Sequence, residues 1–420
     1  MNNSGGKMDL VIRNAKLNRK NELLDIGVQE GKITMIRNRI SAKGKEEIDA
    51  KGRLTTPAFV NPHVHPDKSF VGDEADRLRT GATLEAFTLT HIFKKNYTMQ
   101  NILKRAGKVM ELAARYGSTI VRVFADIDTI GGLLPFKALQ QLKADYKDVV
   151  DIQVVAFPQE GIVKNPGSEE LMKEAMELGP DVVGGIPWFE MTDEDSKYHA
   201  DFIFNLAKKY DKDIHFLEDD TDDPYSRGLE YTASKVIKEK FQRIVTVSHV
   251  EALARYGDAH ADKVIKLVKE AGINVCSNPH ISLWLASRLD PQPIARGVTR
   301  VKELLSAEVN VCSGQDDVND PFYPFGKMDQ LEVAFLTAHA CQMTMPDELE
   351  KVLDMVTYNA AKALGIKDYG LDIGCRADIV IHEAESIKET LRMRLERVYV
   401  IKGGQIIAEN GVVRRSNKSN

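Results

Sequence analysis

Apolar and polar positions alternate at both ends of the chain. Residues 9–17 read DLVIRNAKL and residues 25–38 read DIGVQEGKITMIRN, and residues 377–385 and 397–411 have the same texture. Alternation with a period of two is typical of strands that are buried on one face. The pattern predicts a small β-sandwich that is assembled from both termini of the chain.

The middle of the chain follows a different pattern. Short apolar runs alternate with amphipathic stretches such as 168–179 and 261–272. The eight runs cover residues 57–65, 118–127, 151–159, 181–189, 213–218, 243–250, 273–280 and 309–317. Regular alternation of strand and helix favours a parallel sheet, and eight units favour a closed (β/α)8 barrel of the TIM type. An open doubly wound sheet is the alternative, but no G-x-G-x-x-G follows the first run.

These patterns predict two domains. The terminal segments 1–56 and 365–420 are expected to form the small β-sandwich, and residues 57–364 are expected to form the barrel. A barrel of this type commonly takes about 250 residues, so one large domain with a small companion fits the length of 420 residues.

Composition and charge restrict the classes of partner. The chain has 43% hydrophobic and 28% charged residues and a formal net charge of -5. No basic tract indicates a nucleic-acid partner, and no stretch approaches the roughly 20 apolar residues of a membrane span. The N-terminus lacks the apolar core of a signal peptide. The four cysteines form no CxxC pair, so we expect reduced thiols in a cytoplasmic protein that acts on a small molecule.

Candidate chemistry begins with His63 and His65 at the end of the first predicted barrel strand. Residues two apart on a strand share one face, and the active site of such a barrel lies at the carboxyl ends of the strands. Two neutral imidazoles that converge there form a metal-ligand pair. Taken alone, two such histidines are more often structural than functional.

Further polar residues at other strand ends strengthen this interpretation. His215 ends the fifth run, His249 ends the sixth, and Asp316 with Asp317 ends the eighth. Together these positions offer several imidazole nitrogens and a carboxylate oxygen, a set that suits zinc or iron. The pattern therefore predicts one divalent metal ion at the mouth of the barrel.

Glu218 follows His215 by three residues and is a candidate proton shuttle. It also opens the acidic run Glu218-Asp219-Asp220-Thr221-Asp222-Asp223, which reads equally well as a solvated loop or as a separate cation site. Spacing alone does not choose between these interpretations.

Several blocks of this chain resemble the amidohydrolase superfamily and, within it, the cytosine deaminases. The blocks are PHVHPDKSF, DIQVVAFPQEGI, DVVGGIPWFE, DIHFLE, TVSHVEA, GVTRVKELL and CSGQDDVNDPFYPFG. The resemblance covers nearly the whole chain. The segment PDKSF is closer to N-isopropylammelide isopropylaminohydrolases, which remove an alkylamine from a triazine ring.

The resemblance implies roles for individual residues. It implies His63, His65, His215 and Asp316 as metal ligands, Glu218 and His249 as proton-handling residues, and Gln159 as a contact to the substrate ring. We further expect Asp316 to accept a proton from the metal-bound water, and Asp317, Phe322, Trp188 and His280 to contact or enclose the ring. The resemblance also implies a homo-oligomer. Relatives with two metals carry a lysine on the fourth strand, and the third and fourth runs here contain none, so one zinc or iron ion per subunit is implied.

The chain departs from cytosine deaminases at three positions. Gln315 replaces a histidine, Phe322 replaces a tryptophan, and His280 replaces an aliphatic residue. Because of these changes we do not expect cytosine itself to be the preferred substrate, but the predicted class of reaction stays the same.

The sequence therefore predicts a hydrolytic deaminase of a small aminated nitrogen heterocycle. In this expectation a metal-bound hydroxide attacks the ring carbon that carries the amine, and ammonia is released. Hydrolysis of an N-alkylamino ring or of a cyclic amide by the same centre is the alternative within the enzymes. The second alternative is a binding protein, which we would expect to have lost a metal ligand or Glu218, and none is lost. The third alternative is a structural module in which the histidines are incidental.

Overall fold

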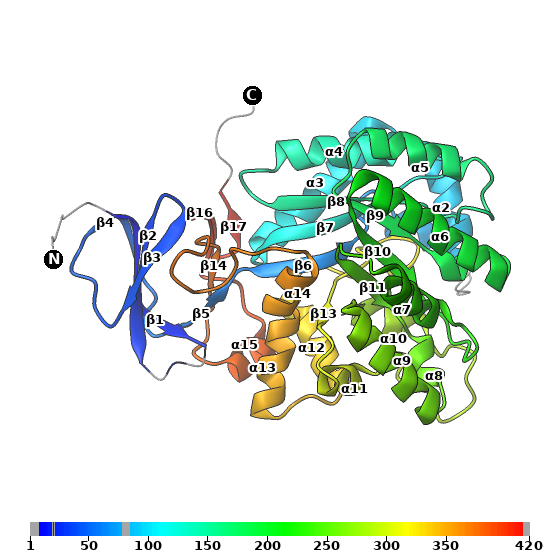
Figure 1. Cartoon of the computed structure of the whole chain (residues 1–420). Coiled ribbons are helices and arrows are strands. Elements are labelled where there is room, and N and C mark those ends of the chain that lie inside the picture. The colour runs from blue at the N-terminus through cyan, green and yellow to red at the C-terminus, as the bar shows by residue number, and fades with distance from the viewer. Residues whose placement is uncertain (1–7, 19, 21, 78–84, 415–420) are drawn as a thin grey trace.

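Eight parallel strands form the larger of two sheets in this computed structural model, which describes residues 8–18, 20, 22–77 and 85–414. They are β6 (Phe59–Val64), β7 (Ser118–Asp126), β8 (Asp151–Phe157), β9 (Val182–Gly185), β10 (Asp213–Glu218), β11 (Val245–His249), β12 (Asn274–Ser277) and β13 (Val311–Ser313). Hydrogen bonds run in order from β13 to β6, and a parallel bridge between Val64 and Asp316 joins the two edges (Figure 1). The predicted barrel is confirmed.

Helices surround this barrel, as the alternating pattern predicts (Figure 1). They are α1 (Gly72–Ala75), α2 (Glu85–Lys94), α3 (Met99–Arg115), α4 (Leu134–Asp145), α5 (Ser168–Glu177), α6 (Asp193–Tyr210), α7 (Gly228–Glu239), α8 (Ala252–Arg255), α9 (Asp258–Ala271), α10 (Pro279–Leu285), α11 (Val301–Ser306), α12 (Gln330–Ala340), α13 (Pro346–Met355), α14 (Tyr358–Ala363) and α15 (Ile387–Met393). The predicted helices at 168–179 and 261–272 correspond to α5 and α9.

Local sequence explains these elements. Every residue of β7 is buried, as expected for a strand covered by helices on its outer face and packed in the barrel on its inner face. The helices α3 and α6 begin after Thr98 and Thr192, whose hydroxyls accept the backbone N–H groups of Asn101 at 3.2 Å and Asp195 at 3.1 Å. Such caps satisfy donors that the first turn of a helix leaves free.

A second, mixed sheet contains segments from both ends of the chain. In the described residues its nine strands are β1 (Met8–Leu17), β2 (Leu23–Gln29), β3 (Lys32–Arg37), β4 (Gly44–Asp49), β5 (Leu54–Pro57), β14 (Ile379–Ile381), β15 (Tyr399–Lys402), β16 (Gln405–Glu409) and β17 (Val412–Val413). Antiparallel pairing of Thr56 with Val380 joins the two ends of the chain. The sheet has its own buried core, which includes Leu10, Ile26 and Ile379.

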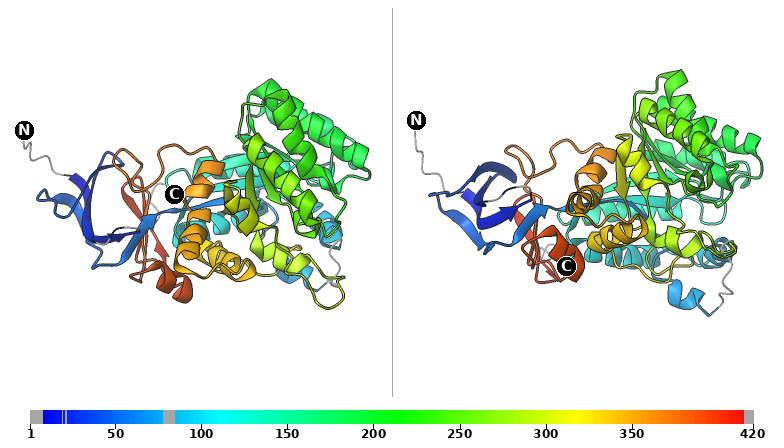
Figure 2. Two further views of the ribbon diagram at one scale, coloured as in Figure 1. Left: turned by 60° about the horizontal axis from the view of Figure 1, so that its bottom comes forward. Right: turned by 90° about the horizontal axis from the view of Figure 1, so that it is seen from below.

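The position of this sheet fixes the direction of the barrel. The chain passes from β5 to β6 across Ala58, so β6 starts beside the terminal sheet. All barrel strands are parallel to β6, and their carboxyl ends therefore lie away from the terminal sheet (Figure 2). The domain limits given above stay a prediction.

Two further expectations concern the environment of the chain. No helix among the described residues is both long and apolar enough to span a membrane. The cysteines Cys276, Cys312, Cys341 and Cys375 are all free thiols, and the first two are buried. This agrees with the expectation of reduced cysteines.

A buried ion pair connects the terminal segment to the barrel and provides a stability test. Arg397 and Asp329 have side chains that are 0% exposed and pair with each other. Arg397→Met removes the buried partner of Asp329 and leaves only the exposed Lys327 at 3.5 Å, so we expect the free energy of unfolding to fall by about 3–5 kcal/mol in urea titration. The control is Arg115→Met at the exposed pair with Glu396, where a change within about 1 kcal/mol is expected. Equal losses in the two variants would contradict this account.

Candidate metal centre and active site

Two histidines at the end of β6 converge at the mouth of the barrel. His63 and His65 are almost fully buried, and their Nε2 atoms lie 3.1 Å apart. They are two residues apart, so the strand places both side chains on its inner face. Burial lowers the pKa of His63 and lowers the pKa of His65 well below its ordinary value. Both rings are therefore neutral at pH 7 and have lone pairs for a metal.

Asp316 completes this group from the other edge of the sheet. Its backbone N–H donates to the carbonyl of His63 at 2.9 Å, and its carbonyl accepts the N–H of His65 at 3.0 Å. Its Oδ1 lies 3.3 Å from Nε2 of His63 and 3.5 Å from Nε2 of His65. Asp316 has a φ of 68°, a conformation that costs energy outside glycine and is often found at functional sites.

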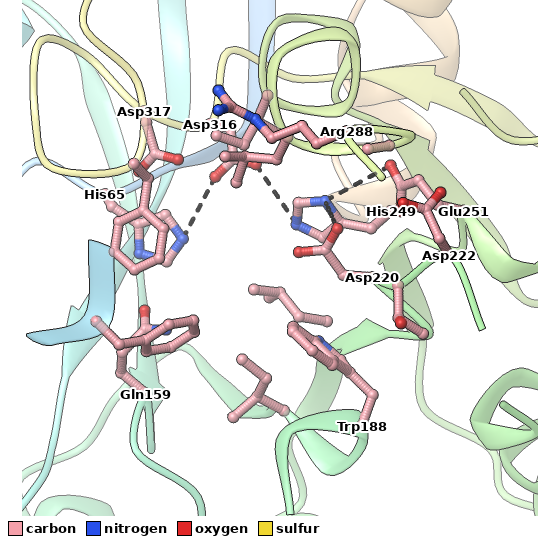
Figure 3. A pocket seen from close by; sticks show the side chains of 18 of the residues that line it. His65, Gln159, Trp188, Asp220, Asp222, His249, Glu251, Arg288, Asp316 and Asp317 are labelled. Carbon is pink, nitrogen blue, oxygen red and sulfur yellow. Dashed lines mark ion pairs between the residues drawn. The ribbon is translucent and has the colours of Figure 1, made fainter. Parts of the chain in front are cut away.

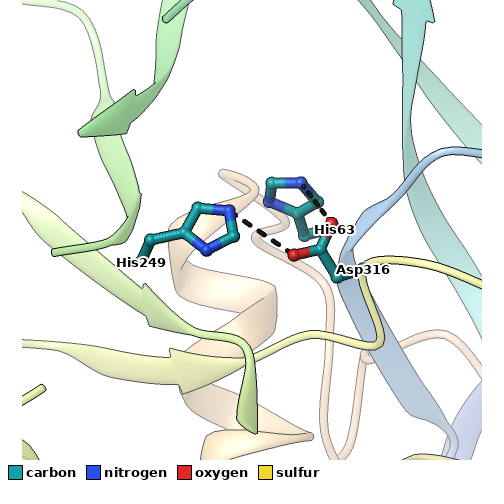
Figure 4. A group of neighbouring side chains, drawn as sticks. All are labelled: His63, His249 and Asp316. Carbon is teal, nitrogen blue, oxygen red and sulfur yellow. Dashed lines mark ion pairs between the residues drawn. The ribbon is translucent and has the colours of Figure 1, made fainter. Parts of the chain in front are cut away.

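His249 approaches Asp316 from the end of β11. Its Nε2 lies 3.4 Å from Oδ2 of Asp316, and the two residues form a compact group with His63 (Figure 4). Burial opposes a charge on His249, but the carboxylates of Asp220, Asp316 and Glu251 prevail and raise its pKa. A ring that is cationic more readily than a free imidazole is suited to stabilise developing negative charge.

Neighbouring polar groups orient the ligands. The hydroxyl of Ser248 lies 2.7 Å from Nδ1 of His63, which turns Nε2 toward Asp316. The amide of Asn278 donates to Oδ2 of Asp316 at 3.1 Å. Such groups fix the tautomer and direction of metal ligands.

His215 is the predicted ligand that the structure leaves outside this group. Its Nε2 faces the hydroxyl of Ser248 at 2.8 Å, and Arg122 donates to its Nδ1 at 3.2 Å. The centre of its ring lies 5.5 Å from that of His63. Both ring nitrogens are thus occupied by protein groups, although the ring borders the same site.

A cavity of about 330 Å³ opens beside these residues. Its walls include His65, Lys68, Phe87, Gln159, Ile186, Trp188, Leu217, Asp220, His249, Glu251, Ile281, Asp316, Asp317 and Phe322. His65 and Gln159 lie on one side, and His249, Asp220 and Trp188 lie on the other (Figure 3). The volume is at the small end of the range for ligand sites, and charged or polar side chains make up more than half of the walls named.

Lys68, Phe87 and Glu251 line the cavity and were not predicted from the sequence, and Lys68 contacts a predicted substrate-binding residue. Lys68 is 1% exposed, and its Nζ donates to Asp126 at 3.0 Å and to Oε1 of Gln159 at 2.7 Å. The amide oxygen of Gln159 is therefore engaged, and its NH2 group is the part that can donate to a ligand. A sequence signal for Lys68 was present, since it lies in the PHVHPDKSF block three residues after His65.

Besides the ligand candidates His63 and His215, two further predicted site residues, Glu218 and His280, lie outside the wall of this cavity. The Oε1 of Glu218 accepts the hydroxyl of Thr232 on α7 at 2.6 Å. His280 lies on α10, and its ring stands edge-on to Tyr323 with centres 5.6 Å apart. Both ring nitrogens of His280 lack a hydrogen-bond partner among the described residues. The structure therefore does not bring either side chain to the cavity.

The donor set fits a divalent metal ion. The Nε2 atoms of His63 and His65 lie 3.1 Å apart, and one carboxylate oxygen of Asp316 lies 3.3 Å and 3.5 Å from them, so three potential ligand atoms converge on one point. Two imidazoles and a carboxylate are ligands that zinc and iron accept.

Residues 73–408 match the amidohydrolase family, and the chain belongs to that family. Members hydrolyse C–N bonds other than peptide bonds, and this protein is an enzyme of that class.

Individual relatives agree with this assignment. The chain is 37% identical to a 5-methylcytosine deaminase from Klebsiella pneumoniae, solved with phosphonocytosine, with a TM-score of 0.91 over 97% of this chain and 100% of that one. It is 26% identical to an N-isopropylammelide isopropylaminohydrolase from Burkholderia multivorans, with a TM-score of 0.82 over 96% and 99% of the chains. An N-isopropylammelide isopropyl amidohydrolase from Pseudomonas sp. is 30% identical, over 96% of this chain and 98% of its own.

The ligand assignment predicts the effect of removing His63. His63→Ala deletes one of two facing nitrogens, so we expect metal affinity to fall by at least about a hundredfold, measured by elemental analysis after dialysis against a chelator. His339→Ala, at an exposed position, is the matched control and should keep its metal. Full metal occupancy in His63→Ala would exclude His63 as a ligand.

Proposed function

We propose that this protein hydrolytically deaminates a small aminated nitrogen heterocycle, related to cytosine in size and polarity. The observation that carries this proposal is the placement of His65, Asp316 and the Gln159 amide in the wall of one small cavity, with His63 within 3.3 Å of Asp316. The 5-methylcytosine deaminase relative supports the same class of substrate.

We infer that His63, His65 and Asp316 hold one divalent ion, with His215 as a further ligand once its ring leaves Ser248. When bound, such an ion lowers the pKa of a coordinated water to about 7 and so supplies a nucleophile at neutral pH. Zinc and iron both suit this donor set.

Residues of the chain bind and orient the ring. The NH2 group of Gln159 donates to an acceptor on the ring edge, because Lys68 already occupies its carbonyl oxygen. Asp317 is buried, and its Oδ1 has no hydrogen-bond partner among the described residues, so it accepts a ring N–H. The aromatic side chains of Trp188 and Phe322 enclose the faces of the ring.

His249 acts on the reacting atoms. Its Nε2 lies beside Asp316, where negative charge develops on the oxygen that adds to the ring carbon. A donor held at such a position stabilises the transition state, and removal of one comparable donor typically costs about a hundred- to a thousandfold in rate.

Removal of an alkylamine from a ring is the second candidate function. The relatives from Pseudomonas sp. and Burkholderia multivorans and the Lys68 contact within the PHVHPDKSF block favour it. The same residues serve both reactions, because only the leaving amine differs. Release of ammonia rather than an alkylamine separates the two.

We also propose where the protein acts in the cell and how its chains assemble. A cytoplasmic location follows from the free cysteines, since oxidising compartments favour disulfides. We further propose a homo-oligomer with one ion per subunit.

We predict that cytosine is a poor substrate and that a ring with an added substituent is preferred. Phe322 lines the cavity, and phenyl in place of indole leaves more volume and removes an N–H donor. Gln315 and His280 do not line the cavity but contact Asp317 and Tyr323, so they influence the choice of substrate only through their neighbours. We expect a kcat/KM for cytosine below about 10⁴ M⁻¹s⁻¹.

The test is a screen for ammonia release over cytosine, 5-substituted cytosines, isocytosine, aminotriazines and N-alkylaminotriazines, with amine detection for the last. Efficient turnover of cytosine would show that Phe322, Gln315 and His280 do not control which ring the enzyme prefers. Absence of ammonia and alkylamine from every ring, with the metal bound, would contradict the proposed function.

A further inference from the structure

The members of the acidic run at residues 218–223 have different partners. The carboxylate of Asp219 accepts two backbone N–H groups at the start of α7, at 2.8 Å and 2.9 Å, and so caps that helix. Asp222 accepts from the guanidinium of Arg255 at 2.8 Å. Asp220 instead lines the cavity, so the run is not a single solvated loop.

Asp220 forms a group with His249, at the end of β11, and with Glu251, just after that strand (Figure 3). Its Oδ1 lies 3.6 Å from Nδ1 of His249, and Oε1 of Glu251 lies 3.9 Å from the same nitrogen. The potential ligand atoms of the three residues all lie within 4.8 Å of one another. We call these three residues the outer cluster, because they meet at Nδ1 of His249, whereas its Nε2 faces Asp316.

The separations within the outer cluster are too long for hydrogen bonds but match the spacing of ligands around a metal ion. The heavy atoms of an N–H···O bond lie about 2.7–3.2 Å apart. Zinc holds nitrogen and oxygen ligands at about 2.0–2.2 Å, which places the ligand atoms of a tetrahedral site about 3.3–3.6 Å from one another. A small adjustment of the side chains therefore lets an ion bind between Nδ1 of His249 and the two carboxylates.

Two buried polar atoms of the outer cluster have no hydrogen-bond partner among the described residues. They are Nδ1 of His249, a residue that is 2% exposed, and Oε2 of Glu251, a residue that is 4% exposed. A buried polar atom without a partner costs free energy. Burial and the charge of Asp220 raise the pKa of Glu251 to about 8, as expected for neighbouring carboxyls that repel each other. A cation would satisfy the nitrogen and both carboxylates together.

The backbone brings the two segments of the outer cluster together. The N–H of Val250 donates to the carbonyl of Glu218 at 2.9 Å, and the N–H of Ala252 donates to the carbonyl of Asp219 at 3.1 Å. These bonds join the segment after β10 to the segment after β11 on both sides of the cluster. The donor atoms are therefore held near one another by the main chain, as a preorganised metal site requires.

We propose that Asp220, Nδ1 of His249 and Glu251 form a second divalent-cation site, separate from the metal centre at His63, His65 and Asp316. One imidazole nitrogen with two carboxylates is a donor set that zinc accepts. This second site is the weaker one, because the side chain of Asp220 is 25% exposed and an ion in the metal centre repels a second ion across His249. It therefore fills only when zinc is in excess of one ion per chain.

The position of the site predicts inhibition by excess zinc. All three residues of the outer cluster line the cavity in which the ring is proposed to bind. A bound ion takes up space in this wall and adds positive charge, which opposes the departure of a protonated amine. The existence of the site does not rest on the proposed function, whereas the inhibition does.

Zinc binding to enzyme that already holds one ion per chain tests the site directly. Equilibrium dialysis against increasing zinc chloride, followed by elemental analysis, is expected to show a second ion in the wild type. Glu251→Gln keeps an oxygen for the Ser282 hydroxyl but loses its charge, and Asp220→Asn also loses a charge. Both should keep the first ion and bind the second at least about tenfold more weakly. Asp223→Asn, at an exposed position of the same loop, is the matched control and should bind zinc like the wild type.

Crystals and kinetics test the position and the effect of the second ion. Anomalous maps are expected to show a peak at the outer cluster in crystals with excess zinc and none there with one zinc per chain. In assays of amine release, excess zinc should inhibit the wild type reversibly. Inhibition of Glu251→Gln should need at least about tenfold more zinc, relative to its own uninhibited rate.

Three results would overturn the inference. They are a second ion that is absent or bound elsewhere, an unchanged affinity for the second ion in folded Glu251→Gln and Asp220→Asn, and loss of the first ion from these variants, which would assign the cluster to the metal centre. Equal inhibition of wild type and variants would contradict the inhibitory role. Failure of the wild type to release any amine would contradict the proposed function, while dialysis and the anomalous maps would still decide whether the site exists.

Discussion

The closure of the barrel between its first and last strands is the constraint on which the rest of the site depends. Val64 and Asp316 form the joining bridge, and the hydrogen bonds of Asp316 to the backbone of His63 and His65 lie directly at this seam. The same bonds that close the sheet therefore bring two imidazoles from β6 and a carboxylate from the segment after β13 within reach of one ion. If the barrel did not close, the two imidazoles and the carboxylate would lie too far apart to share an ion. The metal site therefore depends on the closed barrel.

Much of this arrangement could be predicted from the sequence, because it depends on local patterns. The barrel strands are buried and mostly apolar, as in β7, so each barrel strand was visible as an apolar run. The two-residue spacing of His63 and His65 fixes their common face as soon as the strand is assigned. The terminal strand β4, GKEEID, was missed because its mostly exposed, polar residues give no alternating apolar signal.

The direction of individual side chains at strand ends could not be predicted, because it depends on where each strand stops. Glu218 shares a motif with His215, but β10 continues through it and turns it toward Thr232. In the next segment, Pro279 starts α10 and places His280 on a helix rather than at a strand end. The role of Lys68 depends on its distance to Gln159, which is 91 residues away in the chain and is set only by the closed barrel. Long-range contacts of this kind carry no local sequence signal.

The most direct test of the central claim is the position of the metal. A crystal of the protein loaded with zinc, measured on both sides of the zinc absorption edge, gives an anomalous difference map. The account predicts one strong peak per chain between Nε2 of His63, Nε2 of His65 and the carboxylate of Asp316. Absence of a peak at this position in protein shown to contain stoichiometric zinc, or a main peak between Asp220, His249 and Glu251, would contradict it.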